Sequence, residues 1–126
     1  MRRSGRRSGR VGGRRRRSTV ATWLTEVDRH EQALTSAQEA TDHYRQLAET
    51  TPDAHLPDLA AALHTLADCL DDVGRHELAL AAAQEASDLY RQLAEAWPDR
   101  FGADAAAAAA LLKRLSQAER PAGGPP

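Results

Sequence analysis

The residues best placed to do chemistry are one histidine and two aspartates, His64, Asp68 and Asp72, each four positions after the last. On a helix this spacing puts an imidazole and two carboxylates on one face. Such groups can ligate a divalent metal, but no fourth close ligand accompanies them. We therefore expect a solvated helix face here, with no metal and no cofactor.

Patterns typical of an active site do not occur. The sequence has no Ser–His–Asp arrangement and no paired-carboxylate cleft, and "GRVGG" lacks the flanking strand of a phosphate-binding loop. Cys69 is the single cysteine, so no disulfide can form within the chain. Its apolar neighbours Leu66, Leu70 and Val73 indicate a small core residue. We predict a protein that is not an enzyme.

The charge of the chain is divided between two regions. The formal net charge is −1, yet nine of the 17 basic side chains are arginines within residues 1–18, which contain no acid. The remainder of the chain contains eight basic and 18 acidic side chains. Residues 1–18 also lack apolar side chains apart from Val11 and Met1, so we expect a disordered tail. Residues 119–126 are expected to form a second tail.

The arginine tail could bind the phosphates of RNA or DNA. Its densest run is Arg14, Arg15, Arg16 and Arg17. Such binding would depend strongly on salt and tolerate any base sequence, because no aromatic residues are interleaved for base stacking. The alternative is that the tail has no function.

A helical domain is expected over residues 19–118. Ala and Leu dominate its apolar residues, and runs typical of strands are absent. We expect helices over 19–27, 30–50, from about 57 to 74, 75–97, and from about 103 to just before Pro121. Pro52, Gly74 and Pro98 mark the boundaries.

One stretch of the sequence occurs twice, 46 residues apart. "RHEQALTSAQEATDHYRQLAE" covers residues 29–49, and "RHELALAAAQEASDLYRQLAE" covers 75–95. The match extends on both sides, so we name residues 24–53 copy one and residues 70–99 copy two. Each copy contains a stripe at spacings of four and three, typical of a helix with one apolar face. The stripes are Ala33, Ala37, Ala40, Tyr44 and Leu47, and Ala79, Ala83, Ala86, Tyr90, Leu93 and Trp97.

Residues 60–98 resemble the tetratricopeptide repeat family. The matching positions are Leu63, Leu66, Ala67 and Leu70 in a first helix, Gly74 at the turn, and Ala79, Ala83 and Ala86 in a second helix. Pro98 closes the unit later than in the 34-residue form. That is similar to the longer kinesin-light-chain-like repeat and to repeats in actinobacterial signalling ATPases. Leucines stand where the first helix usually carries large aromatics.

The resemblance, over about residues 20–118, implies an all-α fold: a short solenoid of antiparallel helical hairpins with about two and a half repeats. Solenoids usually need three or more repeats, because each repeat buries its apolar face on a neighbour. Three explanations stay open. The domain is marginally stable, it self-associates, or it is a remnant of a longer array.

In this family the first helix of each pair lines a ligand-binding groove. The resemblance therefore assigns groove positions to Ala61, His64, Asp68, Asp71 and Asp72. The family's clamp for a carboxylate uses Lys, Arg and Asn, which are absent at these positions. An acidic groove would instead favour a basic peptide, and the arginine tail of this chain is one candidate.

The sequence thus predicts a protein–protein interaction module or scaffold. The alternative is a nucleic-acid-associated protein that binds through its arginine tail, and a third reading is a remnant that binds only another copy of itself. No stretch approaches the roughly 20 apolar residues that cross a membrane, so we expect a cytoplasmic protein without a membrane partner.

Overall fold

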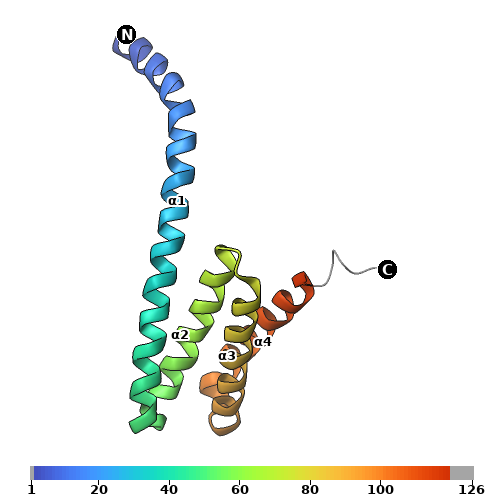
Figure 1. Cartoon of the computed structure of the whole chain (residues 1–126). Helices are drawn as coiled ribbons and strands as arrows, with labels where there is room; N and C mark the ends of the chain where they lie inside the picture. Colours follow the sequence, from blue (N-terminus) through green and yellow to red (C-terminus); the bar gives the residue numbers. More distant parts are fainter. Residues whose placement is uncertain (1, 120–126) are drawn as a thin grey trace.

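Four helices make up the computed structural model, which describes residues 2–119, with side chains for residues 20–118 (Figure 1). They are α1 (Arg2–Thr50), α2 (Pro52–Asp72), α3 (His76–Ala96) and α4 (Pro98–Glu119). Each helix packs against the next one in the chain, and no strand occurs within the described residues. The predicted all-α fold, a short solenoid of consecutive helices, is confirmed. None of the described helices is both long enough and apolar enough to span a membrane.

Helix α1 differs most from expectation. The break that we expected between residues 27 and 30 is wrong, because α1 runs unbroken to Thr50. No glycine or proline occurs between residues 14 and 51, and Asp28 stands at the position aligned with Gly74. The helix begins at Arg2, within the expected tail. The side chains of residues 2–19 lie outside the described ones, so the role of that tail stays a prediction, as does the tail over residues 119–126.

The turn between α2 and α3 depends on a glycine. Gly74 has φ +82°, a left-handed conformation that only glycine adopts without strain. Its N–H donates to the Asp71 carbonyl (3.0 Å), and the Arg75 N–H donates to the Leu70 carbonyl (2.8 Å). These two bonds form a Schellman motif, which satisfies carbonyls at the end of α2. The chain then reverses and α3 packs back on α2.

Two prolines begin helices that we expected to start later. We expected starts near residues 57 and 103, but α2 begins at Pro52 and α4 at Pro98. Proline suits the first helical position, where its missing N–H has no helical partner. It also holds the preceding residue in an extended conformation. Thr51 (φ −136°, ψ 73°) and Trp97 (φ −137°, ψ 75°) accordingly share one geometry in the two copies.

The core lies mainly between α2, α3 and α4, with Leu34 added from α1, and is built mainly from alanine and leucine. Leu63 and Leu115 are its largest fully buried side chains. Small residues on α3 let its neighbours approach closely. The main cluster contains Leu34, Leu59, Leu63, Ala67, Leu70, Ala79, Ala82, Ala83, Ala86, Leu111 and Leu115, and a second contains Ala60, Tyr90, Leu93, Phe101 and Ala108.

The predicted stripe of copy two is buried along α3, except for Trp97, which is 50% exposed at the helix end. Trp97 instead packs edge-on against Phe101, with ring centroids 6.3 Å apart. The stripe of copy one is covered only in part. Ala37 is buried and Tyr44 and Leu47 are half-buried, but Ala33 is exposed.

Candidate functional site

Three of the five predicted groove residues lie together near the end of α2. The His64 Nε2 is 3.9 Å from the Asp68 Oδ2. Arg114 of α4 reaches both carboxylates, with Nη2 3.6 Å from the Asp68 Oδ1 and Nη1 3.6 Å from the Asp71 Oδ2. Arg114 occupies the position aligned with Asp68 in the next repeat. The two aspartates therefore already face a cation, which weakens their attraction for a basic ligand.

His30 and His76 stand at equivalent positions of the two copies but have different environments. The His76 Nδ1 lies 3.7 Å from the Asp71 Oδ1, and its buried Nε2 has no hydrogen-bond partner. His76 thus packs at the α2–α3 turn. His30 stands in the middle of the continuous α1 and is exposed. The chain turns before His76 in copy two and continues as a helix through His30 in copy one, so the two histidines have different surroundings.

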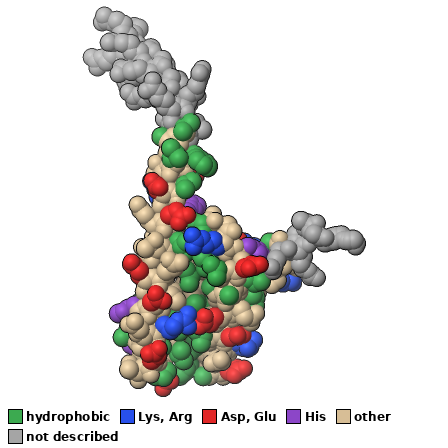
Figure 2. Space-filling model, in the orientation of Figure 1, with side chains coloured by type: hydrophobic (Ala, Val, Ile, Leu, Met, Phe, Trp, Pro, Cys, Tyr) green, Lys and Arg blue, Asp and Glu red, His purple; other side chains and the backbone are tan. Residues whose placement is uncertain are grey.

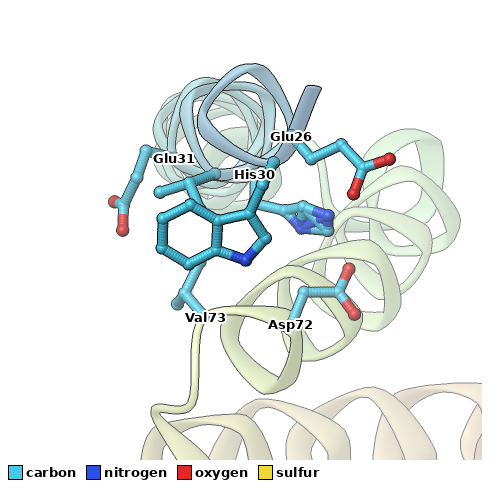
Figure 3. Close-up of a pocket in the computed structure, with 7 residues that line it drawn as sticks. Glu26, His30, Glu31, Asp72 and Val73 are labelled. Atoms are coloured by element: carbon cyan, nitrogen blue, oxygen red, sulfur yellow. The ribbon is translucent and has the colours of Figure 1, made fainter. Parts of the chain in front are cut away.

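Asp72 belongs to a different site from the other groove residues. It lines a hollow of about 370 Å³, the α1–α2 notch, between α1 and the end of α2. Figure 3 shows Asp72 and Glu26 on the same side as the His30 imidazole, with Glu31 pointing away. The full lining is Trp23, Glu26, Val27, His30, Glu31, Asp72 and Val73. Ala61 lies in neither group and is exposed on α2.

Cys69 borders a smaller hollow next to the notch, which it shares with Arg29, His30, Ala33 and Asp72. The side chain is half-buried and packs on the main core cluster. Burial, with smaller contributions from the Asp72 and Asp68 carboxylates, raises the pKa of the thiol. A thiol that stays protonated is a poor nucleophile, in keeping with a packing role.

A row of exposed apolar side chains adjoins the notch. Val20, Trp23, Leu24 and Val27, which we call the α1 stripe, are between 42% and 63% exposed. Figure 2 shows apolar side chains gathered where α1 extends past the other helices. The row continues the buried face of α1, because Val20 and Val27 lead at intervals of seven to Leu34 and Thr41, which are buried against the bundle. The same face that packs within the domain is thus uncovered beyond it.

The notch and the α1 stripe combine acidic and apolar side chains. Among residues 20–118 no three His, Cys, Asp or Glu side chains come together in a way that could hold a metal ion. Carboxylates from Glu26, Glu31 and Asp72 rim an apolar surface that includes an indole. The predicted nucleic-acid residues Arg14, Arg15, Arg16 and Arg17 lie outside the described side chains.

Sequence reasoning missed the notch, the α1 stripe and the part played by Arg114. The apolar residues of the stripe stand at i, i+3, i+4 and i+7, so the face was visible in the sequence. At the turn position, copy one has Asp28 where copy two has Gly74.

A search of protein-family models, of curated proteins and of solved structures finds no match to this chain.

Proposed function

We propose that the chain is a non-enzymatic protein–protein interaction module of the tetratricopeptide type, and that its contact surface is the α1 stripe with the adjoining notch. The observation that carries this proposal is the exposure of Trp23, at 63%, beside three further large apolar side chains on one helical face. A contiguous exposed apolar patch that is rimmed by polar residues typically marks a site of interaction.

The pattern of the α1 stripe suits a helical partner. Anchors at i, i+3, i+4 and i+7 allow two helices to pack along their length. The carboxylates of Glu26, Glu31 and Asp72 around the notch favour a partner with basic side chains. The basic-peptide preference expected for the groove is therefore proposed at the notch, because Arg114 already neutralises Asp68 and Asp71.

The family assignment and the cytoplasmic location stay proposals. The glycine turn between α2 and α3 and the small residues along α3 support a repeat of the tetratricopeptide type. The nucleic-acid alternative depends on arginines outside the described side chains. The experiment below distinguishes it by the effect of nuclease.

The test compares three full-length baits in nuclease-treated lysate: the wild-type chain, a Trp23→Ser/Leu24→Ser variant, and a Leu78→Ser control. Leu78 is 55% exposed on α3 and does not line the notch, so the control removes a similar surface side chain. We expect proteins captured by the wild-type chain and the control to be lost from the stripe variant. Equal capture by all three would contradict the proposed surface. Capture by the wild-type chain seen only in a parallel lysate without nuclease would favour the nucleic-acid alternative.

A further inference from the structure

We propose that the α1 stripe packs on the α1 stripe of a second, identical chain, in a dimer whose two α1 helices run antiparallel about a two-fold axis between Trp23 and Leu24. This assignment names the partner of the contact surface and so rests on the proposed interaction function. The contact is centred on the part of α1 that extends past the other helices (Figure 1).

The stripe is self-complementary under this symmetry. Val20 and Trp23 precede its midpoint, and Leu24 and Val27 follow it at the same distances. A two-fold axis at the midpoint sets Val20 of one chain level with Val27 of the other, and Trp23 level with Leu24. Each apolar residue of one stripe then meets an apolar residue of the other. A contact of this isologous kind closes with two chains.

One partner helix can cover the whole stripe. At 3.6 residues per turn, the four side chains fall within an arc of about 100° around α1, the width of a face that packs on a single neighbour. Each side chain is between 42% and 63% exposed, so the described part of the chain leaves this face open. The second chain needs no other surface of α1.

The partner helix fits beside α2. The buried side of α1 is centred between Ala37 and Thr41, and the stripe is centred about 70° around the helix from that direction. At the spacing of packed helices, about 8–10 Å, two neighbours separated by about 70° around α1 lie roughly 10 Å from each other, so both can pack. The partner helix then passes next to Asp72 and Val73 and covers part of the notch.

Charge favours the antiparallel pairing over a parallel one. A parallel pair would set the carboxylates of Glu26, Asp28 and Glu31 level with the same carboxylates of the other chain. The antiparallel register instead brings residues 14–17, which are four arginines, level with residues 30–33 of the other chain, beside the acidic rim of the notch. Because few large side chains take part, the dimer should be weak and concentration-dependent.

The experiment mixes two full-length chains that each carry Cys69→Ala and a single new cysteine. One has Val20→Cys, and the other has Val27→Cys with a C-terminal tag that changes its mobility. Both positions are exposed, so the substitutions should leave the fold intact, which circular dichroism checks. The matched control mixes Thr22→Cys and Thr25→Cys chains, which keep the same register on the side of α1 that faces away from the stripe.

Under mild oxidation we expect disulfides between the unlike chains, in several-fold excess over either like pair and over the control mixture. In the proposed register two Val20→Cys residues lie about 10.5 Å apart along the helix, beyond the roughly 7 Å that a disulfide allows between Cα atoms. Adding Trp23→Ser/Leu24→Ser to both chains should lower the yield to that of the control.

An excess of like pairs would show a parallel dimer and would overturn the proposal. A yield equal to the control, or one that survives Trp23→Ser/Leu24→Ser, would overturn it too. If in that case the Trp23→Ser/Leu24→Ser bait still lost partner capture, the proposed interaction function would stand with a different partner. Unchanged capture would remove both.

Discussion

Tyr44 and Tyr90 occupy the same position in the two copies, yet Tyr90 is buried and Tyr44 only half-buried. The surrounding sequence is nearly the same, so local sequence does not decide burial here. Helix α3 packs closely on two helices, α2 and α4, whereas α1 packs closely on α2 and reaches α3 through the Arg45–Glu85 ion pair. In a stack of helices, an apolar stripe is therefore buried only where a neighbouring helix covers it.

We attribute this difference to the residue at the turn. Gly74 adopts φ +82° and lets α3 fold back on α2. Asp28 stands at the same position in copy one, where a left-handed conformation would be strained, and the helix continues instead. One residue type thereby separates a closed hairpin from an open helix with an exposed apolar face.

The largest difference between the copies should come from their tyrosines. We expect Tyr90→Ala to lower the free energy of unfolding by about 3–5 kcal/mol, since it empties a buried aromatic site. Tyr44→Ala should lower it by roughly half as much, because part of that ring is already in water. Urea unfolding measures both. Equal losses would show that copy one is as well covered as copy two.

A larger side chain should also destabilise copy two more than copy one. Ala79 is fully buried, so Ala79→Leu should overpack the α2–α3 contact and destabilise the protein by about 1–3 kcal/mol. Ala33→Leu places the same side chain on an exposed site and should leave stability nearly unchanged. Thermal unfolding gives both values. A large loss for Ala33→Leu would mean that a neighbour covers it within one chain.

Exchanging the turn residues tests the cause of the difference. Gly74→Asp should destabilise the protein by about 1–2 kcal/mol, because an L side chain is strained at φ +82°. Asp28→Gly should allow copy one to close. In a Leu24→Cys/Ala33→Cys chain that also carries Cys69→Ala, it should permit a disulfide within one chain, which the straight α1 keeps from forming, as electrophoresis without reductant would show. Absence of this disulfide would mean that residue 28 does not control the turn.

The smallest effects should come from the equivalent arginines. The Arg45 Nη1 lies 2.7 Å from the Glu85 Oε2 and joins α1 to α3, while the Arg91 Nη2 lies 3.0 Å from the Asp88 Oδ1 within α3. Both pairs are exposed, so Arg45→Met and Arg91→Met should each change stability by about 0.2–1 kcal/mol. We expect the Arg45 effect to be the larger and to shrink in high salt. A loss of several kcal/mol from either would contradict this view.

Much of the fold was predictable, because it follows from local rules. The stripe of copy two, the glycine turn and the helical content were read from spacing and residue type. The starts of α2 and α4 were missed, since Pro52 and Pro98 were taken as helix ends rather than first residues. The continuity of α1 was missed because the repeat itself suggested two helices, and one aspartate overrode that pattern.

The candidate site was harder to predict than the fold. His64, Asp68 and Asp71 were expected to face a ligand, but a cation from α4 reaches the two carboxylates. Those contacts join residues 46 and 43 positions apart and depend on packing, which periodicity does not reveal. Asp72 was placed in the same groove, yet it belongs to the notch with Glu26 and His30. Glu26 and His30 lie beside Asp72 because α1 continues without a turn.

The most direct test is the distance across Asp28 within one chain. Spin labels at Ala21 and Gln38, both exposed, would be measured by double electron–electron resonance in Cys69→Ala chains diluted with excess unlabelled protein. Dilution removes pairs between labelled chains. A continuous α1 places the two backbones about 25 Å apart. A closed hairpin would bring them to roughly 10 Å, the spacing of packed helices, and would contradict the open copy one on which the exposed stripe depends.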